Sequence, residues 1–275
     1  MDAEEIDRGI AAFPYWHYEF DLNGRRTPVW RDGHGNRHRQ RRRHLLDPLV
    51  EWAGGSLRGK RLLDLGCNAG FWSLAAVEAG CDFVLGVDGR ASHVEQARFV
   101  FRARGVPAGR YRFRRADVER FDPAGDGPFD VVLCLGLLYH LTRPVELLER
   151  IAALNPEAIV IDTALSRAPG AFLELHRESP EVPHNALRGP LVMVPTARAV
   201  LELAELVGYP ARMLAPDFTD YTGAEDYRTG ARRAFLALRD PAGFGPPFRF
   251  EEAAGPAARR EEAQGWEGGP ARSPG

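Results

Sequence analysis

The sequence predicts an α/β fold in which a mainly parallel sheet carries helices on both faces. Short apolar segments alternate along the chain with segments of helical periodicity, and a glycine-containing loop follows the apolar residues at 61–65. Strands that alternate with helices imply right-handed crossovers, which place ligands at the carboxyl ends of the strands. We therefore expect a functional site at that edge of the sheet.

Length and composition narrow the classes of protein to consider. The 275 residues are enough to bury one full α/β core, and 36 Lys+Arg against 38 Asp+Glu give a net charge of -2, which indicates neither a nucleic-acid nor a membrane partner. Three cysteines are too few and odd in number for a disulfide framework. The chain shows no signal-peptide pattern and no apolar run long enough to cross a bilayer. We expect a cytoplasmic protein with no membrane contact and no bound metal.

Residues 1–54 form an N-terminal extension ahead of the first sheet strand. Residues 13–20 contain five aromatic side chains in eight positions. This segment either packs the extension onto the core or closes over the ligand pocket, because aromatic walls exclude water and suit a cation. In the second interpretation, Trp16, His17 and Tyr18 contribute to the acceptor site.

The most basic stretch of the chain, residues 37–44, precedes a helix with one apolar stripe, which we expect to be interrupted or capped at Asp47–Pro48. The stretch is a solvated helix face, or one arginine meets a ligand carboxylate, or the cluster binds RNA phosphates. Spacing alone does not choose between these three.

The loop after the first strand has glycine at Gly66 and Gly70, and Asn68 lies between them. Glycine tolerates positive φ and lets backbone N–H groups approach a ligand, and asparagine is the residue that most readily replaces it there. The loop lacks the G-x-G-x-x-G pattern, and Asp64 at the end of the strand would repel a pyrophosphate but suit a cationic amine. This favours a positively charged nucleoside over a dinucleotide.

The second strand, at 83–88, ends in Asp88, in the position where an acid accepts hydrogen bonds from ribose hydroxyls. A helix that begins after Ser92 leads to a half-exposed third strand at 111–114, which suits the edge of the sheet.

The chain resembles the class I S-adenosylmethionine-dependent methyltransferases over about residues 55–240. The residues that carry this resemblance are 64–70, Asp88 and 116–118. The resemblance implies a Rossmann-like, seven-stranded, mostly parallel sheet with an antiparallel last strand, and S-adenosyl-L-methionine as cofactor. The cofactor-binding residues that it implies are Asp64, Gly66, Cys67, Asn68, Gly70, Asp88, Gly89, Arg90, Asp117, Val118, Leu135 and Gly136.

The apolar fourth strand, at 129–135, is expected at the centre of the sheet and leads into Tyr139 and His140. His140 is the candidate general base for a hydroxyl acceptor, because an imidazole titrates near neutral pH. Alternatively, His140 only hydrogen-bonds the loop or caps the helix that begins at Pro144. Tyr139 would orient the acceptor or the sulfonium.

A fifth strand at 158–162 precedes residues 163–195, where periodicity fails. Such a long irregular segment is usually functional or mobile, so we take it as a second wall of the acceptor site, with His176 and His184. Trp72 completes the predicted substrate-binding set. A helix after Thr196 and strands at 212–214 and 233–238 end the methyltransferase domain, and we expect residues 241–275 to be a disordered tail.

Residues 137–144 and 14–24 are similar to the bacterial transfer-RNA wobble-uridine (5-oxyacetyl/5-methoxyuridine) methyltransferase family and its small-molecule relatives. In carboxymethyl-transferring members a lysine of the early segment meets the cofactor's extra carboxylate. Here the only lysine is Lys60, and His17 and Tyr18 occupy that segment, which favours ordinary methyl transfer.

The leading hypothesis is methyl transfer from S-adenosylmethionine to a small molecule, at oxygen, in a biosynthetic pathway. The alternative is methylation of a 5-hydroxyuridine-type wobble base, with transfer RNA as the partner. Asp64 and the missing G-x-G-x-x-G pattern disfavour a nicotinamide-dependent oxidoreductase, and the intact cofactor motifs disfavour a catalytically silent scaffold.

Overall fold

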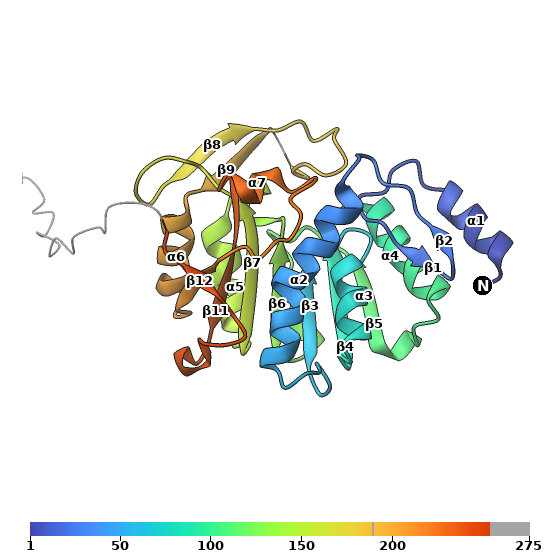
Figure 1. Cartoon of the computed structure of the whole chain (residues 1–275), viewed down its shortest axis with the longest axis horizontal. Helices are drawn as coiled ribbons and strands as arrows, with labels where there is room; N and C mark the ends of the chain where they lie inside the picture. The colour runs from blue at the N-terminus through green and yellow to red at the C-terminus, as the bar shows by residue number, and fades with distance from the viewer. Residues whose placement is uncertain (189, 254–275) are drawn as a thin grey trace, which may run out of the picture.

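The computed structural model describes residues 1–188 and 190–253, and within them the central sheet has the strand order β12-β10-β11-β7-β6-β3-β4-β5 (Figure 1). The parallel strands are β3 (Arg61–Leu65), β4 (Phe83–Asp88), β5 (Tyr111–Arg115), β6 (Val131–Leu135) and β7 (Ala158–Ala164). The antiparallel strands are β11 (Arg232–Leu238), β10 (Ala211–Leu214) and β12 (Phe250–Glu251). The predicted Rossmann-like fold is confirmed, with β12 added to the seven predicted strands.

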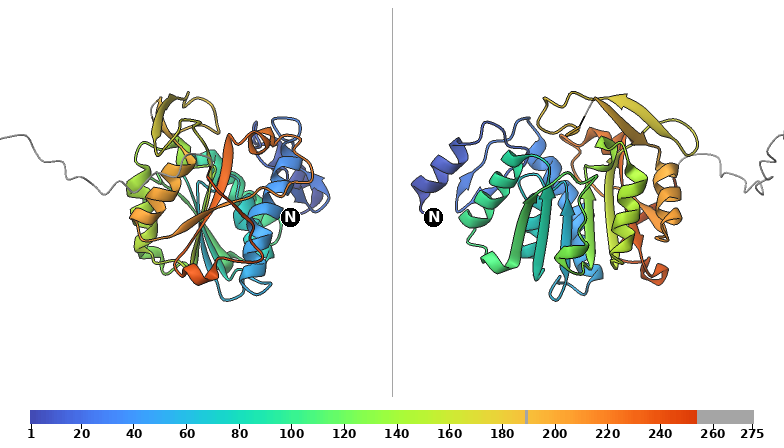
Figure 2. Two further views of the ribbon diagram at one scale, coloured as in Figure 1. Left: turned by 60° about the vertical axis from the view of Figure 1, so that its left-hand side comes forward. Right: turned by 180° about the vertical axis from the view of Figure 1, so that it is seen from behind.

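Helices cover both faces of the sheet, as predicted (Figure 2). Leu62 and Leu63 belong to separate cores, because successive side chains of a strand point to opposite faces. One face packs against α2 (His34–Trp52), α3 (Phe71–Glu78) and α4 (Ala91–Ala103), and the other against α5 (Pro144–Ala153) and α6 (Ala197–Leu206). Short helices lie in the connections: η1 (Ala108–Arg110), η2 (Ala124–Asp126), η3 (Leu138–His140) and α7 (Glu225–Arg228).

The N-terminal extension consists of α1 (Ala3–Ala11), the two-residue strands β1 (Asp21–Leu22) and β2 (Arg25–Arg26), and α2. Helix α2 continues through Pro48, so the predicted interruption there is wrong. Proline keeps a helical φ and removes only one backbone hydrogen bond, and the buried Leu45, Leu46 and Leu49 anchor the helix around it.

The segment predicted to be irregular contains a hairpin of β8 (Leu173–Arg177) and β9 (Leu191–Pro195), seen at the top of Figure 1. Most of β8 is exposed on both faces, so its sequence lacks the apolar–polar alternation of a half-buried strand. The N–H of Met193 donates to the carbonyl of Leu141 at 3.0 Å and fixes the hairpin beside η3. The hairpin therefore stands at the carboxyl ends of the strands.

The predicted start of the C-terminal tail, at residue 241, is too early in the sequence. Residues 241–253 contain η4 (Pro241–Gly243) and β12, and the guanidinium of Arg212 lies over the rings of Phe244 and Phe250 at 4.9 and 5.4 Å. These aromatic contacts join the residues to the sheet. The rest of the predicted tail, 254–275, lies outside the described residues. No helix in the described ranges combines the length and apolarity that a membrane span requires.

Candidate active site

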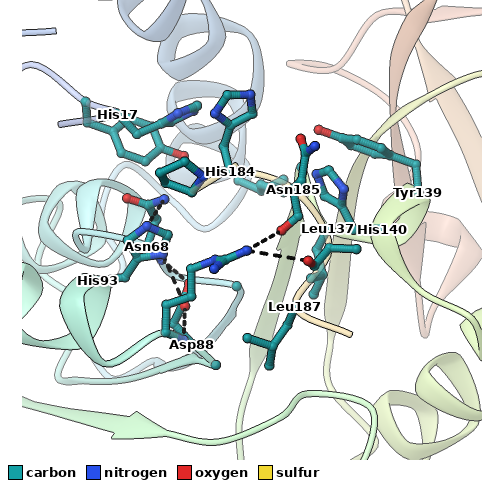
Figure 3. A pocket seen from close by; sticks show the side chains of 18 of the residues that line it. His17, Asn68, Asp88, His93, Leu137, Tyr139, His140, His184, Asn185 and Leu187 are labelled. Carbon is teal, nitrogen blue, oxygen red and sulfur yellow. Dashed lines mark hydrogen bonds and ion pairs between the residues drawn. The ribbon is translucent and has the colours of Figure 1, made fainter. Parts of the chain in front are cut away.

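A cavity of about 510 Å³ opens at the carboxyl ends of the parallel strands. This volume is in the range of small-ligand sites. Figure 3 shows His17, Asn68 and Asp88 on one side of the cavity, and Tyr139 and His140 on the other. Predicted site residues that line it are His17, Tyr18, Gly66, Asn68, Asp88, Gly89, Arg90, Asp117, Val118, Leu135, Gly136, Tyr139, His140 and His184.

The loop between β3 and α3 adopts the left-handed backbone that its sequence predicts. Gly66, Asn68 and Gly70 have φ values of +72°, +49° and +80°. A Cβ at Gly66 would lie 3.3 Å from the side chain of Leu137, tighter than usual contacts. Glycine therefore suits this position both for its positive φ and for its close packing against Leu137.

The carboxylate of Asp88 organises this loop. One oxygen accepts the backbone N–H of Asn68 at 3.0 Å, and the other accepts the N–H of Arg90 at 2.8 Å and contacts His93 Nδ1 at 3.2 Å. Asp88 thus joins the glycine loop to the start of α4. Because it also lines the cavity, it presents a negative charge there.

Asp64 does not share the cavity with Asp88, contrary to the sequence prediction that both acids face one ligand. Its side chain is buried in the layer between β3 and α3, where it accepts a hydrogen bond from Ser73 Oγ at 2.6 Å. Burial raises the pKa of Asp64 from its usual 3.8 to about 7.

Two further predicted cofactor residues also lie behind the cavity surface. Cys67 is buried, and burial raises the pKa of its thiol well above the usual range. Gly70 packs so closely that an added Cβ would lie 3.1 Å from the Phe113 ring and 3.2 Å from Ala97. These residues shape the loop without contacting the cavity.

Three predicted substrate-binding residues lie away from the cavity lining. Trp16 is 1% exposed and packs edge-on against Phe13 and Phe20 in the core. Trp72 is buried beneath the guanidinium of Arg41, 5.1 Å from its ring. His176 is on the exposed hairpin, 3.4 Å from Glu174. For Trp16 the structure favours the packing interpretation of the aromatic segment.

Tyr139 and His140 lie on η3, directly after β6. The hydroxyl of Tyr139 accepts a hydrogen bond from Arg232 Nη2 at 3.0 Å, and the rings of Tyr139 and His140 have centroids 3.9 Å apart. His140 Nδ1 lies 2.6 Å from Glu178 Oε2. Sequence reasoning missed Arg232 and Glu178, because both come from segments far along the chain.

A buried network of charges closes this end of the cavity. Asp162 accepts hydrogen bonds from Arg41 Nη2 at 3.1 Å, from Arg232 Nη1 at 2.6 Å and from the hydroxyl of Tyr227. Asp226 pairs with Arg37 at 2.6 Å and with Arg232 at 2.9 Å. Asp162 lies near the carboxyl end of β7, and Asp88 is the last residue of β4. An acid that follows an apolar strand was the available sequence signal.

The basic stretch of α2 therefore divides into two sets. Arg37 and Arg41 turn inward to the acids of the network and line the cavity. On the outer side, Arg39 lies 3.2 Å from Glu19 and Arg42 lies 3.4 Å from Glu78. Most of these arginines are thus paired with acids of the chain itself.

Uncharged rings from the N-terminal extension form one cavity wall. Burial, followed by neighbouring histidines and arginines, lowers the pKa of His17 well below its usual range and that of His34 to about 4. Burial also lowers the pKa of His184, which stacks on Trp30 with centroids 4.8 Å apart. Near neutral pH these imidazoles are neutral and do not repel a cationic ligand.

The segment 180–188 covers the side of the cavity that holds Asp88 and Asp117. Arg90 Nη2 donates to the carbonyls of Val182 and Asn185, each at 3.2 Å. Arg188 Nε lies 2.5 Å from Asp117 Oδ2. Within residues 1–188 and 190–253, no group of three His, Cys, Asp or Glu is placed to hold a metal ion.

A family model described as a methyltransferase domain matches residues 37–212. The ubiquinone biosynthesis O-methyltransferase of Bordetella avium (strain 197N) is 35% identical over 136 residues, which cover 47% of this chain and 54% of that protein. The enzyme of that name from Actinobacillus pleuropneumoniae serotype 5b (strain L20) is 27% identical over 182 residues, which cover 63% of this chain and 69% of that protein. The chain spans about half the length of the first of these relatives.

Solved structures match more of the chain. The N-terminal domain of EvdMO1 with SAH (S-adenosylhomocysteine) bound has a TM-score of 0.65 and 26% identity, covering 86% of this chain and 97% of that one. Magnesium protoporphyrin IX methyltransferase from Synechocystis PCC 6803 with bound SAM has a TM-score of 0.56 and 18% identity. The match covers 87% of this chain and 98% of that one. The second likeness shows the fold alone.

The buried Asp64 predicts a pH-dependent stability. A carboxyl whose pKa is raised in the folded state binds its proton more tightly there, so stability falls as pH rises from 3.8 to about 7. We expect Asp64→Asn to match the wild type in urea unfolding near pH 4. At pH 8 the variant should be more stable by up to about 4 kcal/mol, from about 1.4 kcal/mol per pKa unit. A constant difference between the two proteins across this range would contradict the assignment.

Proposed function

The chain belongs to the methyltransferase domain family, and on this premise we propose that it transfers a methyl group from S-adenosyl-L-methionine to a hydroxyl of a small molecule. One observation carries the proposal. Asp88 ends β4 beside the left-handed loop of Gly66 and Asn68, and His140 lines the same cavity. The cavity therefore combines an acid for ribose, a glycine loop and a candidate base.

The residues on the cavity surface fit the cofactor. Asp88 would accept hydrogen bonds from the ribose hydroxyls, and the backbone at Gly136, where an added Cβ would meet nothing within 4 Å, would allow close approach. Asp117 and Val118 would meet the adenine. When bound, the cofactor supplies an electrophilic methyl group on a sulfonium. The ion pair of Arg188 with Asp117 lies in this region, so we infer that residues 187–188 shift on binding.

Charge and hydrophobicity also suit a sulfonium ligand. His17 and His184 are neutral near pH 7 and line the cavity with Tyr18, so these three rings add no positive charge, and Arg37 and Arg41, which also line it, are paired with acids of the chain. In methyl transfer much of the rate enhancement comes from holding the acceptor oxygen in line with the methyl carbon in a dry pocket. The aromatic part of the cavity wall would serve this purpose.

His140 is the base that we propose for the acceptor hydroxyl. It lines the cavity on the side opposite Asp88 in Figure 3, and Tyr139 beside it is held by Arg232. A positioned imidazole that removes a proton in the transition state typically contributes about 10²–10⁴-fold to the rate. Tyr139 would then orient the acceptor.

A small molecule is favoured over transfer RNA as the acceptor. The curated relatives described above are named O-methyltransferases of ubiquinone biosynthesis, and these comparisons do not support the transfer-RNA alternative. The arginines of α2 are also paired with acids of the chain. Arg41 pairs with the buried Asp162, Arg37 with the half-buried Asp226, and Arg39 with Glu19. Few of their charges remain for phosphates.

Removing the ribose acid tests the cofactor site. We expect Asp88→Ala to weaken S-adenosylhomocysteine binding by about 100-fold in calorimetric titration, because two hydrogen bonds to a charged group are lost. Asp82→Ala, at an exposed position just before β4, should bind like the wild type. Unchanged affinity of the Asp88 variant, with its thermal unfolding intact, would refute this assignment.

The acceptor class is tested by following the methyl group. Protein incubated with methyl-labelled S-adenosylmethionine and either the low-mass fraction of a bacterial extract or total transfer RNA should label the low-mass fraction, in an alkali-stable ether linkage. Label in the transfer RNA alone would reverse the proposed choice of acceptor.

A further inference from the structure

Glu178 and His140 form a side-chain pair across two segments that are 38 residues apart in sequence. Their contact, from Glu178 Oε2 to His140 Nδ1, measures 2.6 Å, and the side chains are 18% and 11% exposed. The same carboxylate oxygen accepts the backbone N–H of Ala186 at 2.9 Å. The backbone N–H of Glu178 donates to the carbonyl of Pro190 at 2.8 Å, which anchors the residue where β8 ends and the connection to β9 begins.

The charge state of Glu178 determines which nitrogen of His140 carries the proton. Burial alone would raise the pKa of Glu178, but the hydrogen bonds from His140 and Ala186 outweigh it and hold the pKa below its usual range. A carboxylate at neutral pH only accepts hydrogen bonds. His140 Nδ1 must then be the donor, so Nε2 of the neutral ring carries the lone pair.

The other contacts of His140 leave Nε2 available to a ligand. The ring packs against Tyr139, whose hydroxyl is held by Arg232. In the described part of the chain Nε2 has no hydrogen-bond partner, and His140 lines the cavity. Glu178 therefore fixes both the tautomer and the direction of the ring.

We propose that Glu178 is a positioning residue, which holds His140 as the Nδ1–H tautomer with Nε2 directed to the acceptor hydroxyl; this inference rests on the proposed function. In the transfer the acceptor oxygen bonds to the methyl carbon while the bond from that carbon to sulfur breaks with its electron pair. The hydroxyl proton passes to Nε2, and the nearby carboxylate stabilises the resulting imidazolium.

The competing explanation is a purely structural role. Through Ala186, the carboxylate also fastens the segment 180–188, which Arg90 holds from the other side. A residue that only fastened this segment would alter ligand affinity or stability and leave the tautomer of His140 unchanged. The two roles therefore differ in their spectroscopic and kinetic consequences.

The tautomer is measured directly by long-range ¹H–¹⁵N NMR of the full chain, with the His140 signals identified by their loss in His140→Ala. In the wild type we expect a protonated Nδ1 and an unprotonated Nε2. In Glu178→Ala we expect the pattern to shift towards the Nε2–H tautomer that imidazole prefers in water. A wild-type ring already in the Nε2–H form, or an identical pattern in both proteins, would overturn the inference. This test needs neither cofactor nor acceptor.

A double-mutant cycle tests the consequence for catalysis, with the low-mass extract fraction as the acceptor probe. Glu178→Ala should slow methyl transfer by about 10–100-fold with less than threefold change in S-adenosylhomocysteine affinity. In the His140→Ala background the same change should cost less than threefold, because residues that act as a unit are not additive. Glu181→Ala, at an exposed position in the same segment, is the matched control.

Failure of the proposed function and failure of the inference about Glu178 would give different results. A wild type that labels neither the low-mass fraction nor transfer RNA would overturn the proposed function and the catalytic role of Glu178 with it. An active wild type whose Glu178→Ala variant keeps its full rate, or loses equal rate with and without His140, would overturn the inference alone.

Discussion

The hydrogen bonds to the carboxylate of Asp88 are the constraint on which the site depends. A single side chain at the end of β4 accepts backbone N–H groups from Asn68, in the loop after β3, and from Arg90, at the start of α4. A carboxylate has about four acceptor positions, so the backbone orients Asp88 and leaves acceptor capacity for a ligand at the cavity edge. The left-handed loop and the carboxylate at the cavity edge thus hold each other in place.

The opposite side of the cavity is assembled from distant parts of the chain. Helix α2, strand β7 and strand β11 meet through Arg41, Asp162 and Arg232, and Arg232 extends this network to Tyr139. A buried ion pair is costly to break, because the remaining charge is left without a partner. This network therefore fixes the N-terminal extension to the sheet and holds η3 in one position. The candidate base owes its placement to tertiary contacts more than to its own loop.

The sheet, the left-handed Asn68 and the placement of Asp88 at the cavity were predictable, because apolar runs and loop chemistry determine them locally. The direction in which each side chain points was harder to predict from the sequence. Asp64 and Trp16 have suitable chemistry, yet they point into the packed layers, and His176 lies on an exposed hairpin strand. The pairing of His140 with Glu178 joins segments 38 residues apart, so no local pattern indicates it. Residues 241–253 resemble a tail in composition, but their aromatic contacts with Arg212 attach them to β10.

The most direct measurement of the central claim is a crystal structure of the chain with S-adenosylhomocysteine. The account predicts both ribose hydroxyls within hydrogen-bond distance of the Asp88 carboxylate, with Asn68 still left-handed and residues 187–188 displaced from Asp117. A ligand bound elsewhere, or a ribose that does not contact Asp88, would contradict it.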